Sequence, residues 1–140
     1  MTYSGSCSCG GVTVSIEGEP AAVRQCWCRQ CQKVAGGGAS NNAMFNTADV
    51  TLSGDLASAT WTAASGNTLT HWRCANCGNP VYGQSSARPQ FMTMRLGILD
   101  PGHRLAPQAV IWTDDAPAWA VIDPALPAFA RQPPPPGAKD

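Results

Sequence analysis

Short segments in which apolar and polar residues alternate run through most of this chain. In the stretch GVTVSIEG, Val12, Val14 and Ile16 alternate with polar residues, which is the period of two expected for a strand with one buried face. Six further segments are rich in β-branched or aromatic residues and are bounded by turn formers: NNAMFNT, DVTLSG, SATWTA, TLTHWRC, QFMTMRLGIL and AVIWT. The pattern predicts a fold built from many short strands.

Helical signals are weak by comparison. No window holds an apolar period of 3.6 residues, and the best candidate is a turn or two over RQCQKVAG, which the glycines at 36–38 end. We therefore expect a mainly β protein of small antiparallel sheets with little helix. At 140 residues the chain is long enough for one ordinary core, and we expect a single domain over residues 1–130.

The last ten residues, RQPPPPGAKD, form a proline-rich tail over residues 131–140. We expect an extended polyproline conformation and a mobile end; a ligand for a proline-reading domain is the alternative.

Charge and hydropathy narrow the range of partners. Only 13% of the residues are charged and the formal net charge is zero, so no basic surface for nucleic acid or anionic lipid is expected. No apolar run approaches the roughly 18 residues that span a bilayer, and MTYSGSCSCGG does not resemble a signal peptide. These features predict a cytoplasmic protein whose partners are small molecules or other proteins.

Seven cysteines fall into three groups: Cys7 and Cys9, then Cys26, Cys28 and Cys31, then Cys74 and Cys77. Disulfides are rare in a reducing cytoplasm, so clustered cysteines there are better interpreted as metal ligands. A secreted disulfide scaffold is the alternative.

The first and last groups can form one complete metal site. Cys74 and Cys77 form a C-x-x-C turn followed by Gly78, which is the geometry of a zinc knuckle. Cys7 and Cys9 lie two apart, so on an extended segment they project from the same face. Four thiolates leave no open position and indicate a structural site, which would join the early and late parts of the chain.

Cys26, Cys28 and Cys31 then remain as a local group, which we call the triad. Catalytic zinc sites commonly have three protein ligands and an open fourth position, where an external thiol could bind as its thiolate. Free or redox-active thiols are one alternative, and a histidine as fourth ligand is another. His71 is expected to point away from the face of Cys74, and His103 lies in the turn-like segment DPGHR.

Five segments together resemble the glutathione-dependent formaldehyde-activating (GFA) family. They are GSCSCGGVTV, CWCRQCQKVAG, HWRCANCGNPVY, GILD and IWTDDAPAWAVIDPALPAF, in this order from about Gly5 to Phe129. The resemblance implies a tent-like arrangement of small β-sheets with a structural zinc between them, held by Cys7, Cys9, Cys74 and Cys77. It also implies a second, reactive zinc on Cys26, Cys28 and Cys31.

The activity that the resemblance implies is that of a carbon–sulfur lyase, which joins glutathione and formaldehyde or acts on related thiol–aldehyde adducts. A non-catalytic zinc module that binds a thiol or a protein partner is the alternative, and a purely structural metal protein or redox thiol store is a third hypothesis. An open triad loses metal and oxidises more readily than a closed site. Carboxylates of glutathione would need cationic partners, for which the candidates are Arg24, Arg29, Lys33, Arg73 and Arg95; a solvated surface charge is the alternative for each.

Two positions depart from the family pattern. Trp27 stands between the first two cysteines of the triad and Val110 stands in the strand VIWTD, where the family often has histidine. We therefore expect no general acid or base beside the triad. Trp27 is expected to pack in the core, with the wall of an apolar substrate pocket as the alternative.

Overall fold

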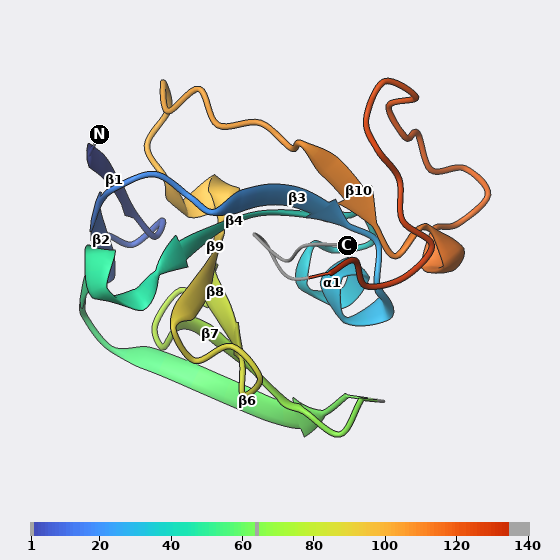
Figure 1. Cartoon of the computed structure of the whole chain (residues 1–140). Coiled ribbons are helices and arrows are strands. Elements are labelled where there is room, and N and C mark those ends of the chain that lie inside the picture. Colours follow the sequence, from blue (N-terminus) through green and yellow to red (C-terminus); the bar gives the residue numbers. More distant parts are fainter. Residues whose placement is uncertain (1, 64, 135–140) are drawn as a thin grey trace.

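Two β-sheets form the protein, as the computed structural model shows for residues 2–63 and 65–134 (Figure 1). The smaller sheet has the order β1-β2-β5, with β1 at Thr2–Ser6, β2 at Thr13–Glu17 and β5 at Val50–Ser53. The larger sheet has the order β10-β3-β4-β9-β8-β7-β6. Its strands are β3 (Ala22–Cys26), β4 (Ser40–Asn46), β6 (Leu56–Thr62), β7 (Thr68–Cys74), β8 (Pro80–Ser85), β9 (Phe91–Arg95) and β10 (Ala109–Ile111).

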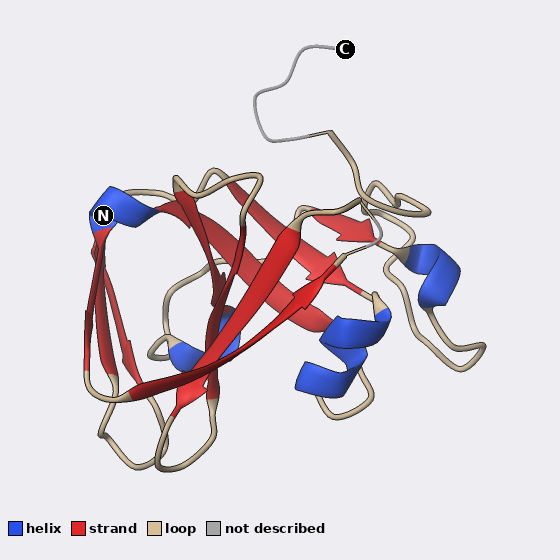
Figure 2. Ribbon diagram, turned by 90° about the horizontal axis from the view of Figure 1, so that it is seen from below, coloured by secondary structure: helices blue, strands red, loops and turns tan. Residues whose placement is uncertain are grey.

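Helix is confined to short pieces in the described part of the chain, as Figure 2 shows. They are α1 (Arg29–Val34) and the 3₁₀ turns η1 (Thr47–Asp49), η2 (Leu96–Ile98) and η3 (Thr113–Asp115). No helix between residues 2 and 134, leaving aside residue 64, is long and apolar enough to cross a membrane. The expected fold class, mainly β with little helix, is confirmed.

All seven segments expected to form strands do so, and the expected helical turn is α1. The pattern missed β1, β3 and β8, because TYSGS, AVRQC and PVYGQS contain glycine, proline or adjacent polar residues that hide the period of two. One pairing also differs from the expected antiparallel arrangement: β10 lies parallel to β3. The connection from η2 returns along the sheet before β10 begins, so β10 runs in the same direction as β3.

The two faces of the larger sheet have different roles. One face carries apolar residues such as Phe45, Val81 and Met94, which pack with Val14 and Ile16 of the smaller sheet in the main core. Because side chains alternate between faces along a strand, the neighbouring residues point the other way. The second face therefore carries a row of mostly polar positions, matched by the strand register and running from β3 to β7: Cys26, Ser40, Asn42, Arg95, Thr93, Gly83 and His71.

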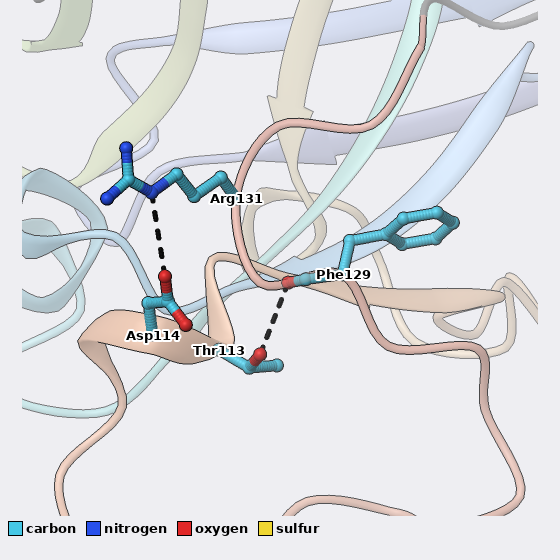
Figure 3. A network of polar contacts seen from close by, with 4 residues as sticks. All are labelled: Thr113, Asp114, Phe129 and Arg131. Atoms are coloured by element: carbon cyan, nitrogen blue, oxygen red, sulfur yellow. Dashed lines mark hydrogen bonds and ion pairs between the residues drawn. The ribbon is translucent and has the colours of Figure 1, made fainter.

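Residues 127–131 fold back along β10 and η3. The Val110 amide donates to the Pro127 carbonyl at 2.9 Å, and the Phe129 amide donates to the Val110 carbonyl at 2.8 Å. Figure 3 shows the Thr113 hydroxyl donating to the Phe129 carbonyl at 3.3 Å and Arg131 facing Asp114, with 3.5 Å between nitrogen and oxygen. The C-terminal segment thus fixes the strand that borders the triad.

Hydrogen bonds to the rest of the protein continue beyond residue 130. The Trp112 amide donates to the Arg131 carbonyl at 3.4 Å, and Arg24 donates to the Pro134 carbonyl at 3.4 Å. A domain boundary at residue 130 stays a prediction. The rest of the expected tail, residues 135–140, lies outside the described residues.

Candidate metal centres

Cys7, Cys9, Cys74 and Cys77 come together in space, with all four sulfur atoms within 4.8 Å of one another. The Sγ of Cys9 lies 3.5 Å from that of Cys7 and 3.7 Å from that of Cys74. Four sulfurs at about 2.3 Å from a tetrahedral zinc lie roughly 3.8 Å apart. The donor set and its spacing therefore fit zinc.

Two tight turns aim these sulfurs at one point. Gly10 and Gly78, one after each pair of cysteines, have φ of 75° and 78°, a left-handed conformation that favours glycine. The amides of Gly10 and Gly78 donate to the carbonyls of Cys7 and Cys74, both at 3.0 Å. A glycine amide thus closes each turn, three residues after Cys7 and four residues after Cys74.

Backbone amides in these turns donate hydrogen bonds to the sulfur atoms. The Val12 amide donates to Cys7 Sγ at 3.2 Å, and the Cys77 amide donates to Cys74 Sγ at 3.4 Å. Hydrogen bonds from Asn76 and from the Gly11 amide lower the pKa of the Cys9 thiol to about 6. The pKa of Cys77 is also lowered, whereas that of Cys74 is raised. Metal ligands must be deprotonated, so Cys9 and Cys77 are the thiols that the turns prepare to bind a cation.

The cluster also joins distant parts of the fold. Cys7 follows β1 and Cys74 ends β7; both side chains are buried in the main core, with 5% and 2% exposed. The Ser8 amide donates to the Asn79 side chain at 2.6 Å, which links the two turns directly. A metal held by these four sulfurs would connect β1 and β7.

The triad forms the second cluster, with its three sulfurs within 4.8 Å of one another. Cys26 ends β3, Cys28 is the N-cap of α1, and Cys31 lies in the first turn of this helix. The Cys31 amide donates to Cys28 Sγ at 3.3 Å, so one thiol caps the helix that carries the next. Among the described residues, no fourth metal-ligating side chain belongs to this group.

The pKa values of the triad thiols shift in different directions. Hydrogen bonds from Cys26 and Cys28, followed by one from Ser40 and the positive charge of Arg95, lower the pKa of the Cys31 thiol. The same contacts with Cys28 and Cys31 raise the pKa of Cys26. Cys31 is therefore the first of the three thiols to become a thiolate, and a metal cation is needed to keep all three ionised.

Trp27 and Gln32 hold the triad loop in place. Trp27 is 4% exposed, as expected, and its amide donates to the Ile111 carbonyl at 3.0 Å. Its ring meets that of Trp119 edge to face, with 6.2 Å between the ring centres. The Gln32 side chain donates to the carbonyls of Trp27 at 2.7 Å and Asp115 at 2.9 Å, so it ties α1 to η3.

One histidine lies on the same face of the larger sheet as Cys26 of the triad. His71 points away from Cys74 and belongs to neither cysteine cluster, but it lies on the polar face of the sheet, close enough for the charge of Cys31 to act on its pKa. A Cβ atom on Gly83 would lie 3.2 Å from both the His71 ring and Arg95 Nη2. The pairing of β7 with β8 and of β8 with β9 places His71 on this face, and no local sequence motif predicts that position.

His71 should be neutral throughout the physiological pH range. Burial, followed by the positive charge of Arg95, lowers its pKa from 6.5 to about 4. The ring is therefore uncharged above about pH 4 and gains a proton only below it. Titration of the ¹⁵N-labelled imidazole by NMR should give this value, with assignment from a His103→Gln variant, and Arg95→Gln should raise it. A midpoint near 6.5 in the native protein would contradict the prediction.

The five candidate cations differ in burial. Arg29, Lys33 and Arg73 are exposed and Arg24 is half-buried, whereas Arg95 is only 8% exposed. Arg95 Nη1 donates to the Asn42 side chain at 2.6 Å, across the β4–β9 pair. Of the five, Arg95 is therefore the one that the fold positions firmly beside the triad.

Fold and clusters together define a small β protein with two cysteine-based sites that could hold metal ions. The family model described as glutathione-dependent formaldehyde-activating enzyme matches residues 2–115, and the chain belongs to this family. A crystal structure of a Rhodobacter sphaeroides protein is similar at 19% identity with a TM-score of 0.56, over 90% of this chain and 98% of that one. At this identity the likeness concerns the fold. A comparison with curated proteins gives no significant match.

Proposed function

We propose that this protein is a zinc-dependent carbon–sulfur lyase of the GFA type that acts on adducts of aldehydes with glutathione or another small cytoplasmic thiol. The observation that carries the proposal is the triad: three converging sulfurs from one short segment, without a fourth ligand among the described residues. Such a donor set is typical of sites that leave one position for water or substrate. The cluster of Cys7, Cys9, Cys74 and Cys77 is assigned a structural zinc.

In this proposal the chain positions the reactants around the triad. Zinc, when bound there, supplies the positive charge that keeps a thiol ionised near neutral pH. The thiol sulfur forms a bond to the aldehyde carbon, and the proton from sulfur must reach the former carbonyl oxygen. His71, a neutral imidazole on the same face, is the residue we assign to this transfer. The reverse sequence breaks the carbon–sulfur bond.

A non-catalytic module that binds a thiol or a protein partner at the triad is the second candidate. The weak basicity of His71 favours it, because a group with a pKa of about 4 is poorly matched to proton transfer at neutral pH. This candidate shares the metal site and the thiol with the lyase. It differs in predicting binding without turnover.

Cobalt substitution can test the proposed function. Thiolate ligation gives Co²⁺ an absorption band, so adding glutathione to the cobalt-loaded protein should change this band, and Cys28→Ser should abolish the change. Turnover of a panel of thiol–aldehyde adducts, followed by NMR, should accompany binding, and His71→Gln should slow it without changing metal content. Binding without turnover would favour the non-catalytic module. A wild-type spectrum that no thiol alters would refute the lyase and leave only the module that binds a protein partner.

A further inference from the structure

Arg95 is a buried cation without a carboxylate partner among the described residues. Its Nη1 bonds to the neutral amide of Asn42, while its Nε is buried and has no hydrogen-bond partner in the described structure. Burial lowers the pKa of Arg95, and the charges of Cys31, Cys26 and Cys28, together with a side-chain hydrogen bond to Cys31, counteract this effect. Buried charges in proteins are normally paired and fully hydrogen-bonded, so this guanidinium retains the capacity to bind another anion.

A cavity of about 480 Å³ has Arg95 among its lining residues, and its volume is within the range of small-molecule sites. It extends from Ser40, which borders the triad, to Ser8 and Asn79 beside the four-cysteine cluster. Arg95 is the one ionic side chain among its lining residues, which are otherwise apolar, glycine, amide, hydroxyl or the thiol of Cys7. A cavity with a single positive charge in neutral surroundings favours a ligand with a single negative group.

We propose that Arg95 determines specificity by binding a carboxylate of the thiol that enters at the triad, with the rest of that ligand in the adjoining cavity. This proposal rests on the proposed function, because the thiol end of the ligand is placed at the triad metal. The sheet register supplies the arrangement: Arg95 lies opposite Asn42, two positions along β4 from Ser40, which itself lies opposite Cys26. The carboxylate and the sulfur of one small molecule would thus bind at neighbouring points of the same face.

The contribution of the carboxylate to binding can be measured with two thiols of nearly equal size. 3-Mercaptopropionate and 3-mercapto-1-propanol differ in one terminal group, and their affinities are measured on the cobalt-loaded protein at pH 7 from the thiolate band. The wild type should prefer the acid by about tenfold or more, the usual worth of one charge-assisted hydrogen bond. Arg95→Gln should remove this preference while leaving the affinity for the alcohol and the metal content unchanged. Arg95→Lys, which keeps the charge, should retain part of it.

Arg29→Gln is the matched control. Arg29 lies between two triad cysteines but is exposed, and its Nη1 donates to Gln32. This variant therefore removes one positive charge near the triad but leaves the positive charge of Arg95 in the cavity lining unchanged. It should keep the preference for the acid. An equal loss in Arg29→Gln, or no preference in the wild type, would overturn the proposal.

Metal content separates the remaining outcomes. If Arg95→Gln loses one metal per chain, Arg95 balances the charge of the triad, and the ligand proposal is wrong. If the alcohol binds and the acid has no advantage, the proposal for Arg95 fails while the proposed function stands. If neither thiol binds at the triad, both fail.

Discussion

Cys74→Ser should abolish cooperative folding or lower the melting temperature by tens of degrees. The sulfurs of Cys9 and Cys74 lie 3.7 Å apart although 65 residues separate them in sequence, so the metal would close a long loop. Structural zinc contributes about 10–16 kcal/mol in zinc-finger peptides, comparable with the entire stability of about 5–15 kcal/mol of an ordinary domain. Loss of one thiolate removes much of this, and it leaves a buried hydroxyl where Cys74 is only 2% exposed.

Thermal unfolding followed by circular dichroism, with zinc measured on the same samples, checks this result. A chelator that removes all zinc from the wild type should reproduce the effect, because metal binding and folding are coupled. Cys28→Ser makes the same chemical change at the triad and is the matched control. A Cys74→Ser protein that melts at the wild-type temperature would show that the four-cysteine cluster does not hold the fold together.

Cys28→Ser should lower the zinc content from two per chain to one and remove thiol binding, while the fold persists. The triad ligands all lie within residues 26–31, so the metal here closes no long loop. Serine is also a favoured N-cap residue, and its hydroxyl can accept from the Cys31 amide as the Cys28 sulfur does. Helix α1 should therefore remain, with a change in melting temperature of a few degrees at most.

Elemental analysis of metal per chain, before and after the substitution, measures the main effect. Two zinc ions retained in Cys28→Ser would mean that another ligand completes the site. One zinc in the wild type, together with triad cysteines that alkylating reagents modify in the native protein, would support the third hypothesis of a structural metal protein or thiol store. Purification under reducing conditions with added zinc is needed, because an open site of three thiols loses metal and oxidises readily.

The cysteine groups could be assigned from the sequence because their geometry is largely local. A C-x-x-C turn followed by Gly78 places two sulfurs together whatever the rest of the fold does. The alternation in β2 and the end of α1 before three glycines are also local signals, and the structure has both. The sequence pattern did not predict the strands β1, β3 and β8, because they form through pairing with neighbouring strands and their own composition does not favour a strand.

The positions of His71 and Arg95 could not be predicted from such local signals. Their approach over Gly83 depends on the β7–β8, β8–β9 and β4–β9 registers, and a shift of one residue in any of them would send a side chain to the opposite face. The sequence by itself determined the strand-rich fold, the three local cysteine groups and the family. Only the tertiary structure decided which residues surround the triad, because strand pairing brings together residues that are far apart in the chain.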